Sequence, residues 1–201
     1  RKKRSRESIL NRIDFHKKKI SDIQVCEAFL DSFLYEEKED NKNKLDSIIE
    51  LKEEVEEYIC LKKHSSNFKS NRRKEQASTI KEIQSPSGFK IQIGGNNRQN
   101  ELISLRKGKK GDLWFHAQET PGSHVVLKSS NGLVDEKDIQ LAADLASFFS
   151  RARGNKIVPI IMVPIENLQR ISGALPGTVS HRGGKVLWGK AERAEKYFYH
   201  K

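Results

Sequence analysis

Cysteine, aromatic residues and long apolar runs are all scarce in this sequence of 201 residues. Its two cysteines, Cys26 and Cys60, form no Cys-x-x-Cys pair, which argues against a disulfide framework or a zinc ribbon and favours a reducing compartment. No apolar run approaches the roughly 20 residues that a membrane span needs, and no signal-peptide pattern opens the chain, so we expect no membrane partner. The first residue is Arg1 rather than Met, and we expect the chain to be the C-terminal part of a longer protein.

Sequence signatures of common catalytic sites are also missing. The chain has no His-Glu-x-x-His zinc motif, no Gly-x-Ser-x-Gly nucleophile turn and no Walker loop. The catalytic alternative is a metal-dependent hydrolase in which His116 and His124 meet across a turn. Asp112 and Ser123 are the further groups that such a site would use. We expect no enzymatic activity, no catalytic residue, no metal and no cofactor.

Positive charge is concentrated in the second half of the chain. Lys and Arg number 38 against 27 Asp and Glu, and the sequence pI is about 9.6. Residues 1–87 carry a net charge of +3, whereas residues 88–201 carry +8. A basic surface favours a polyanionic partner, with nucleic acid ahead of an anionic membrane. We therefore expect the second half to hold a nucleic-acid surface.

The first part of the chain has a coiled-coil pattern. Apolar residues in the 1–61 segment recur at alternating spacings of four and three, which predicts a helical hairpin. Residues 62–87 are polar, basic and without periodicity, which predicts a linker, so that 88–201 would be the globular domain. The expected seam positions are Ile9, Ile13, His16, Ile20, Ile23, Glu27, Leu30 and Leu34, followed by Leu45, Ile48, Lys52, Val55 and Ile59.

Residues 111–127 form the stretch around which the second half is organised. Two apolar runs, 113–115 and 125–127, flank a Thr-Pro-Gly-Ser turn, which predicts a β-hairpin. Because side chains alternate along a strand, Trp114 and His116 should share one face while their neighbours pack in a core. An aromatic and polar face indicates a binding surface. We expect Trp114, His116 and His124 to project into water beside cationic loops.

Further strand and helix patterns predict an α+β domain around this hairpin. Residues 135–153 have Asp135 as a natural N-cap and Gly154 as a stop, which predicts a long packed helix. Pro159 indicates that its strand is an edge strand or contains a bulge. We expect a small, mainly antiparallel sheet with one long packed helix, preceded by the helical segment. The other strand patterns cover residues 89–93, 156–163 and 185–189.

The turn after the first of these strands is a candidate phosphate site. Gly94 and Gly95 let the backbone approach a ligand closely, and the N–H groups of a helix start favour anions. Asn96 and Asn97 tolerate the turn, and Arg98 is the nearest cation. Alone, this pattern is a weak signal for a phosphate site.

Several motifs in the second half resemble, in the same order, the C-terminal RNA-binding module of the NFACT family, NFACT-R. An ordered series of motifs is a far stronger signal than any one of them, and the resemblance covers roughly residues 86–190. The motifs are GGNNRQN (94–100), DLWFH (112–116), PGSH (121–124), AADLA (142–146), SRAR (150–153), VP (158–159), GALPG (173–177) and VLWG (186–189).

The resemblance implies a factor that binds obstructed large ribosomal subunits carrying a stranded peptidyl-tRNA, and that in many members supports C-terminal tailing of the stalled chain. It implies the large subunit, tRNA or rRNA and the N-terminal remainder of the parent chain as partners, in the cytoplasm or the chloroplast stroma. A protein-docking module is the alternative, and salt separates the two because RNA binding weakens with ionic strength. The candidate RNA contacts are Asn96, Asn97, Arg98, Asn100, Arg106, Lys107, Trp114, His116, Ser123, His124, Arg151 and Arg153.

Overall fold

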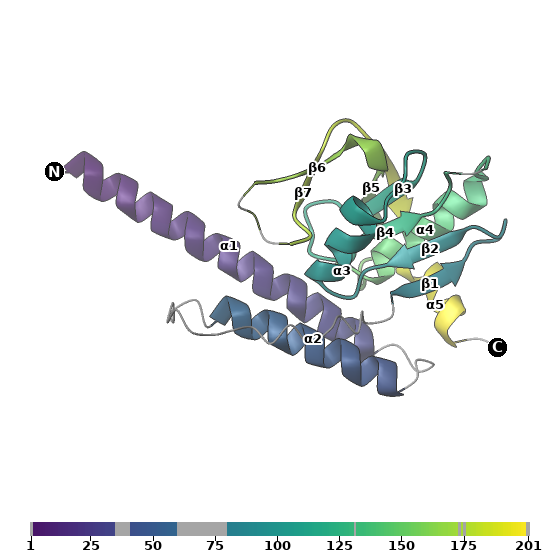
Figure 1. Cartoon of the computed structure of the whole chain (residues 1–201), viewed down its shortest axis with the longest axis horizontal. Helices are drawn as coiled ribbons and strands as arrows, with labels where there is room; N and C mark the ends of the chain where they lie inside the picture. The colour runs from purple at the N-terminus through teal and green to yellow at the C-terminus, as the bar shows by residue number, and fades with distance from the viewer. Residues whose placement is uncertain are drawn as a thin grey trace.

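The computed structural model describes residues 2–34, 41–59, 80–130, 132–172, 174 and 176–199. Two helices, α1 (Lys2–Leu34) and α2 (Asn41–Ile59), lie side by side as a hairpin, and α1 extends well beyond the globular domain (Figure 1). The remaining elements form that domain, which combines an antiparallel sheet with short helices. The predicted α+β class and the preceding helical segment are confirmed.

The main sheet has six strands in the order β1-β2-β4-β3-β5-β8, and every neighbouring pair is antiparallel. A separate pair, β6 and β7, forms a two-stranded sheet. The strands are β1 (Lys81–Gln84), β2 (Lys90–Ile93), β3 (Leu113–Ala117), β4 (Val125–Leu127), β5 (Val158–Pro164), β6 (Leu168–Arg170), β7 (Val179–His181) and β8 (Lys185–Gly189). The other helices are α3 (Asn97–Glu101), the π-helix η1 (Leu102–Arg106), α4 (Glu136–Phe148), the 3-10 helix η2 (Ile165–Asn167) and α5 (Ala191–Tyr199).

The predicted hairpin is present as β3 and β4. Trp114 pairs with Val126 and Phe115 with Val125, so alternate residues of β3 point to opposite faces of the sheet. Phe115 and Ala117 enter a core beneath α4, whereas Trp114 enters a second core on the other face. The predicted division of faces is therefore confirmed, and each face has its own apolar core.

Helix α4 covers the first face. Asp135 is its N-cap, in a reciprocal capping box with Asp138. The helix ends at Phe148 rather than near Gly154, because the chain beyond it is held by the β3–β4 connection: Ser150 bridges to Gly122, and the Arg151 N–H donates to the carbonyl of Pro121 at 2.9 Å. Helix α5 packs on α4, with the Phe198 and Phe148 rings stacked at 5.0 Å.

The second face is covered by the α3–η1 segment and by the β6–β7 pair. Ile103 from η1 and Leu168 from β6 pack over the sheet residues. The core here contains Ile103, Trp114, Val126, Ile161, Val163, Ile165 and Leu168. Two layers of cover on one sheet leave the strand ends and the covering elements, not the sheet face, available to a partner.

Two strand expectations need correction. Lys81–Gln84 lies in the stretch expected to be a linker, but it forms β1, whose Ile83 pairs with Ile91 and packs against the core beneath α4. Strand β5 is internal rather than an edge strand. Pro159 is tolerated there because it lies where the β3 ladder ends, and its carbonyl accepts from the Gln118 N–H at 2.9 Å. Residues 62–79 of the expected linker lie outside the described residues.

The expected coiled-coil seam is wrong along α1 and only partly right along α2. Ile9, Ile13, Ile20, Ile23, Leu30 and Leu34 of α1 are exposed, as is Leu45 of α2. The buried residues between α1 and α2 are Cys26, Phe29, Phe33 and Leu51, and the expected Ile48 and Val55 of α2 pack against them while partly exposed. Large rings at positions 29 and 33 outweigh the aliphatic pattern because they bury more apolar area.

Candidate nucleic-acid interface

The tryptophan and histidines of the central hairpin form a cluster in which Trp114 and His124 are buried and His116 is half-buried. Trp114 is only 2% exposed, stacks on His116 at a centroid distance of 5.6 Å and meets the edge of His124 at 4.9 Å. His116 and His124 meet at 5.3 Å. The expectation that these rings project into water is wrong for Trp114 and His124, because η1 and β6 pack over the face that carries them, while His116 keeps part of its surface exposed. They meet as predicted, but inside the protein.

Hydrogen bonds tie this cluster to the covering helix. The Nδ1 atom of His124 lies 2.8 Å from the Ser104 hydroxyl, and the His124 N–H donates to Asn100 Oδ1 at 2.9 Å. Ser123 is buried and its N–H donates to the Phe149 carbonyl at 2.9 Å. Trp114 Nε1 has no acceptor within the described part of the chain. Asn100, Ser123 and His124 thus have structural partners, and an RNA contact through them stays a prediction.

Burial also sets the charge of the two histidines. Removal from water lowers the pKa of His116 to about 4, while backbone hydrogen bonds at Gly122 and Ala117 oppose this shift. Removal from water, followed by the nearby His116, lowers the pKa of His124 well below its usual value. Both rings are therefore neutral at neutral pH, and the cluster adds no positive charge to a nucleic-acid surface.

Asp112 lies apart from the histidines and holds the basic loop instead. Its fully buried carboxylate accepts from the Lys109 N–H at 2.9 Å and the Ser130 N–H at 3.2 Å, and it pairs with the Lys128 ammonium. Asp112 thus lies apart from His116, Ser123 and His124, the other residues that the alternative metal-dependent hydrolase would use. Among the residues that the structure describes, no group of three His, Cys, Asp or Glu is arranged to hold a metal.

The Gly-Gly-Asn-Asn turn has the predicted helix start but holds carboxylates of its own chain. Asn96 is the N-cap of α3, and its side chain accepts from the Gln99 N–H at 2.8 Å. Asn96 Nδ2 donates to Glu50 Oε2 at 3.0 Å, and the Asn97 N–H donates to Glu54 Oε2 at 3.3 Å. Two carboxylates of α2 therefore lie where a phosphate was expected.

Gly94 is required at this turn for steric reasons. A Cβ atom on it would lie 2.1 Å from Asn100 Oδ1 and 3.0 Å from the Asn100 backbone nitrogen. The close approach lets Asn100 reach His124, so the glycine serves packing within the domain.

Arg151 and Arg153 follow α4 and differ in their surroundings. The Arg153 Nε donates to the Phe148 carbonyl at 2.5 Å, and its guanidinium lies over the Phe148 ring at 4.3 Å. It thus caps the C-terminal end of α4. Arg151 is about half exposed and lies 4.0 Å from Glu27 of α1. Of the two, Arg151 has the more accessible charge.

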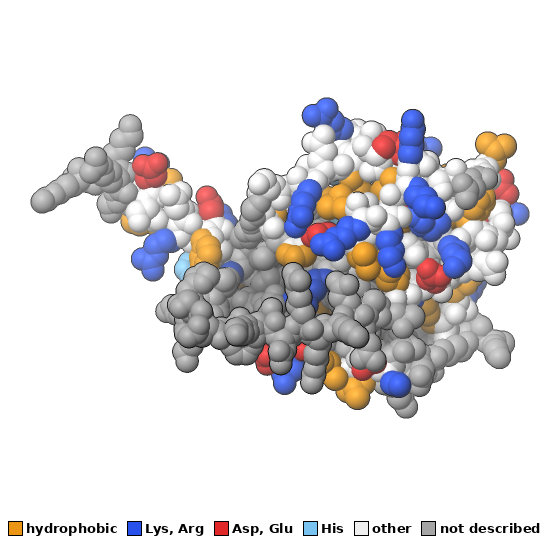
Figure 2. All heavy atoms as spheres, in the orientation of Figure 1, with side chains coloured by type: hydrophobic (Ala, Val, Ile, Leu, Met, Phe, Trp, Pro, Cys, Tyr) orange, Lys and Arg blue, Asp and Glu red, His pale blue; other side chains and the backbone are white. Residues whose placement is uncertain are grey.

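The exposed cations among the predicted contacts lie in the segment before β3 and at the start of α3. Arg106 and Lys107 are exposed, together with Lys109 and Lys110 of the same loop, and Arg98 is exposed on α3. Figure 2 shows many Lys and Arg side chains on the visible face of the globular domain, with fewer acidic ones among them. The loop is held in place by Asp112, so these cations are presented by a fixed backbone.

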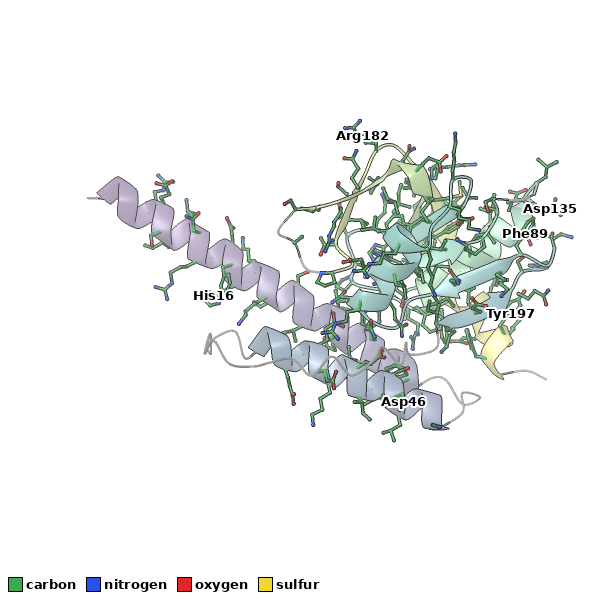
Figure 3. All side chains as sticks on the ribbon, in the orientation of Figure 1. His16, Asp46, Phe89, Asp135, Arg182 and Tyr197 are labelled. Atoms are coloured by element: carbon green, nitrogen blue, oxygen red, sulfur yellow. The ribbon has the colours of Figure 1, made fainter. Side chains whose placement is uncertain are left out.

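Three exposed residues were absent from the predicted RNA contacts. Trp188 on the edge strand β8 is 62% exposed, and its carbonyl is held by Gln140 Nε2 at 3.0 Å. The strand alternation of residues 185–189 points the residue outward and could have identified it. Arg170 of β6 also has a largely exposed side chain. Arg182, after β7, points away from the domain (Figure 3).

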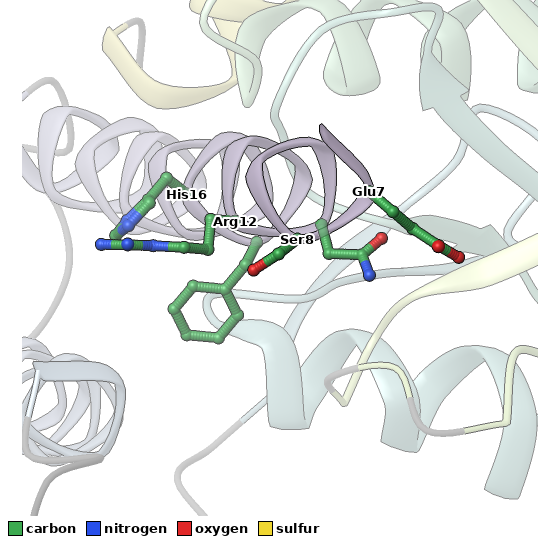
Figure 4. Close-up of a pocket in the computed structure, with 6 residues that line it drawn as sticks. Glu7, Ser8, Arg12 and His16 are labelled. Atoms are coloured by element: carbon green, nitrogen blue, oxygen red, sulfur yellow. The ribbon is translucent and has the colours of Figure 1, made fainter. Parts of the chain in front are cut away.

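A hollow on α1 gives no site. It is lined by residues of that single helix, among them Glu7, Arg12 and Phe15 (Figure 4). A hollow formed by one exposed helix face does not enclose a ligand.

The fold and the exposed cations together define a class, an α+β module with the features of a nucleic-acid-binding domain. The family described as "NFACT protein RNA binding domain" matches residues 79–183, more than half of the chain. The chain belongs to this family. The resemblance inferred from the ordered motifs is thereby confirmed.

Curated relatives and a solved structure show the same likeness. The chain is 36% identical over 136 residues to the Rqc2 homolog RqcH of Bacillus subtilis (strain 168), and the match covers 67% of this chain and 23% of that protein. It is 42% identical over 97 residues to the RqcH of Streptococcus suis (strain 05ZYH33), covering 48% of this chain and 17% of that protein. The chain thus spans about a quarter or less of these relatives.

The solved structure is the C-terminal part of the fibronectin/fibrinogen-binding protein from Streptococcus suis. It superposes with a TM-score of 0.75 at 28% identity and covers 98% of this chain and 73% of that one. No helix in the described ranges is long and apolar enough to span a bilayer.

Proposed function

We propose that this chain is the RNA-binding part of a ribosome-associated quality-control factor. In this proposal it binds tRNA or rRNA on large ribosomal subunits that carry a stalled peptidyl-tRNA, and supports C-terminal tailing of the stalled chain. The family match over residues 79–183 supports an RNA-binding role. The relatives named RqcH support the place of the parent protein in ribosome quality control.

The observation that carries the proposal within the structure is the fixed basic loop. Arg106, Lys107, Lys109 and Lys110 are exposed, and buried Asp112 holds their backbone. Cations on a rigid backbone contact phosphates without the entropy cost of ordering a loop. The domain therefore binds RNA chiefly through phosphates, and not by stacking bases on the buried Trp114.

A different residue, Trp188, offers an exposed aromatic ring to an RNA base. Trp188 offers a free indole face on a strand whose carbonyl is fixed by Gln140, and Val186 lies exposed beside it. A ring held on a rigid strand suits base stacking. The same exposed pair also favours a second candidate function, docking of another protein, which is independent of ionic strength where RNA binding is not.

Crosslinking tests the proposal directly. The full-length protein would be crosslinked to ribosomal fractions in cells, and the attached RNA sequenced. A triple variant, Lys107→Ala with Lys109→Ala and Lys110→Ala, should lose most crosslinks to tRNA or 23S rRNA. The matched control, Lys137→Ala with Lys156→Ala and Lys196→Ala, removes three exposed lysines elsewhere in the domain and should crosslink normally. Crosslinks unaffected by the first triple variant, or salt-independent association with ribosomes, would contradict phosphate binding by this loop.

A further inference from the structure

Two arginines from different elements share one buried carboxylate at the edge of the covered face. Arg106 Nη2 lies 3.3 Å from Glu101 Oε1, and Arg170 Nη2 lies 3.4 Å from Glu101 Oε2. The Glu101 side chain is 7% exposed, whereas those of Arg106 and Arg170 are 66% and 61% exposed. Each carboxylate oxygen takes one guanidinium, so both are held next to each other with most of their surface in water.

The π-helix η1 explains why Arg106 reaches Glu101. These residues are five apart, and an α-helix would place them about 140° apart around its axis. The Lys107 N–H donates to the Leu102 carbonyl, five residues back, at 2.8 Å, which is the π-helical spacing. The wider turn brings position 106 back towards position 101. π-turns are often found at functional sites, and here the turn places a cation.

The charges at this point are not balanced. One carboxylate faces two guanidiniums, which leaves a net charge of +1 at one place. Both guanidiniums are largely exposed, and one of them is enough to pair with the buried Glu101 carboxylate, so charge balance does not require the second arginine. Each guanidinium has five N–H donors, and Glu101 engages few of them. The remaining donors are available to a second anion.

We propose that Arg106 and Arg170, oriented by Glu101, form a clamp for a backbone phosphate of RNA. This inference rests on the proposed function and names the site within it. A phosphodiester has two non-bridging oxygens, and a guanidinium pairs with such oxygens through two parallel hydrogen bonds. Arg106 and Arg170 contact the phosphate, whereas Glu101 is a positioning residue that acts through them.

The clamp joins the two elements that cover the second face of the sheet. Arg106 ends η1, and Arg170 ends β6. A phosphate bound between them also contacts the segment that continues into Lys107. The exposed Lys107, Lys109 and Lys110 supply further, less directional charge to the next phosphates along the strand.

The test measures RNA affinity of the 201-residue chain by fluorescence anisotropy with labelled deacylated tRNA, and by sedimentation with purified large ribosomal subunits. Arg106→Ala and Arg170→Ala should each weaken binding on the order of fivefold, and because the two share one phosphate, the dependence of log Kd on log salt should become shallower by at most about one unit. Arg12→Ala on the exposed face of α1 removes the same charge and serves as the matched control. Thermal unfolding and circular dichroism should be nearly unchanged in all three.

Glu101→Gln separates positioning from charge. The variant keeps the shape of the side chain but adds one unit of net positive charge, so unspecific electrostatics would strengthen RNA binding. If Glu101 orients the clamp, binding weakens in spite of the added charge. Stronger binding by Glu101→Gln would overturn the positioning role.

The outcomes for the clamp and for the proposed function differ. If the wild-type chain binds neither tRNA nor large subunits, the proposed function fails, and the clamp with it. If the wild type binds RNA and both arginine variants bind as tightly as Arg12→Ala, the clamp is wrong while RNA binding stands. Selective loss in Arg106→Ala and Arg170→Ala supports both.

Discussion

The two faces of the central sheet are built from the same strands but differ in chemistry. On the α4 face, β3 contributes Phe115 and Ala117 to a core made of apolar side chains. On the opposite face, the same strand contributes Trp114 and His116, which meet His124 and, through it, the hydroxyl of Ser104. The α4 face is held chiefly by apolar packing, with polar contacts such as that of the Gln140 amide with the Trp188 carbonyl, whereas on the other face the ring cluster itself makes directional polar contacts with the covering segment.

The polar contacts on the Trp114 face of the sheet have a structural role. Apolar packing tolerates small shifts between layers, whereas hydrogen bonds and ring contacts fix the covering segment in one position. The fixed segment, α3 with η1, carries Arg106 and leads into the basic loop. In our proposal the histidine cluster thus helps to position the cations that we assign to RNA.

Truncating the ring on the polar face should have the largest effect. Trp114→Ala removes a ring with 2% exposure and should lower the free energy of unfolding by about 3–5 kcal/mol, much as Phe115→Ala should on the other face. Urea unfolding measures both. A folded Trp114→Ala variant with native stability and lost RNA binding would contradict the structural role.

Trp114→Phe sharpens the same comparison. The indole Nε1 has no acceptor among the described residues, so its removal relieves a buried unpaired donor and offsets part of the lost packing. We expect Trp114→Phe to stay folded with RNA affinity within about twofold of the wild type, because in our proposal phosphate contacts supply most of the affinity. Anisotropy with labelled tRNA checks this.

Lowering the pH should reduce the free energy of unfolding through the histidines on the Trp114 face of the sheet. Burial lowers the pKa of His116 from 6.5 to about 4 in the folded chain, so the unfolded chain binds the proton more readily. Stability is therefore complete above pH 6.5 and falls as the pH drops towards 4, by about 3 kcal/mol for this residue. Denaturant unfolding at a series of pH values measures the slope.

A His116→Gln variant should show a shallower slope over this window. Glu82 titrates mainly below this pH window. A hydrogen bond from Gln92 lowers its pKa, so its contribution to the free energy of unfolding is lost only below its usual value of 4.5. An identical slope in His116→Gln and the wild type would show that His116 is not the titrating group.

The smallest effects should come from the helix caps. Asp135→Ala, at the start of α4, should cost about 1 kcal/mol. Asn96→Ala, at the start of α3, should cost about 2 kcal/mol, because Asn96 is buried and its loss also removes a hydrogen bond to Glu50. Thermal unfolding ranks the two. Equal costs would mean that the contact with α2 contributes nothing.

Much of the fold was predictable because local patterns and tertiary structure agree. The alternation of the hairpin around Trp114, the cap at Asp135 and the strand 185–189 all follow from periodicity and turn chemistry. The early end of α4 was not predictable, because it depends on Pro121 and Gly122, which lie far away in the sequence. The strand Lys81–Gln84 was hidden by its polar residues, because Ile83 is its single apolar residue and a four-residue segment with one apolar residue shows no alternation.

The candidate site was harder to predict, because burial is a tertiary property. The sequence correctly placed Trp114 and His116 on one face, but it contains no local sign that the α3–η1 segment and β6 pack over that face. The pairing of Arg106 and Arg170 with Glu101 was hidden for the same reason, since 69 residues separate Glu101 from Arg170 and no periodic pattern connects them. By contrast, simple alternation along residues 185–189 could have revealed the outward direction of Trp188, which was missed.

The contact between α2 and the Asn96–Asn97 turn gives the helical hairpin a mechanical consequence. Helix α1 has 33 residues and is therefore about 50 Å long. If Glu50 and Glu54 act as the pivot, which lies beside Phe29, about 40 Å of α1 extends beyond it, and a tilt of about 10° displaces its far end by about 7 Å. The hydrogen bonds of Glu50 and Glu54 thus help to set the direction of α1. A small change in the angle between the helical hairpin and the domain produces a much larger displacement at the tip of α1.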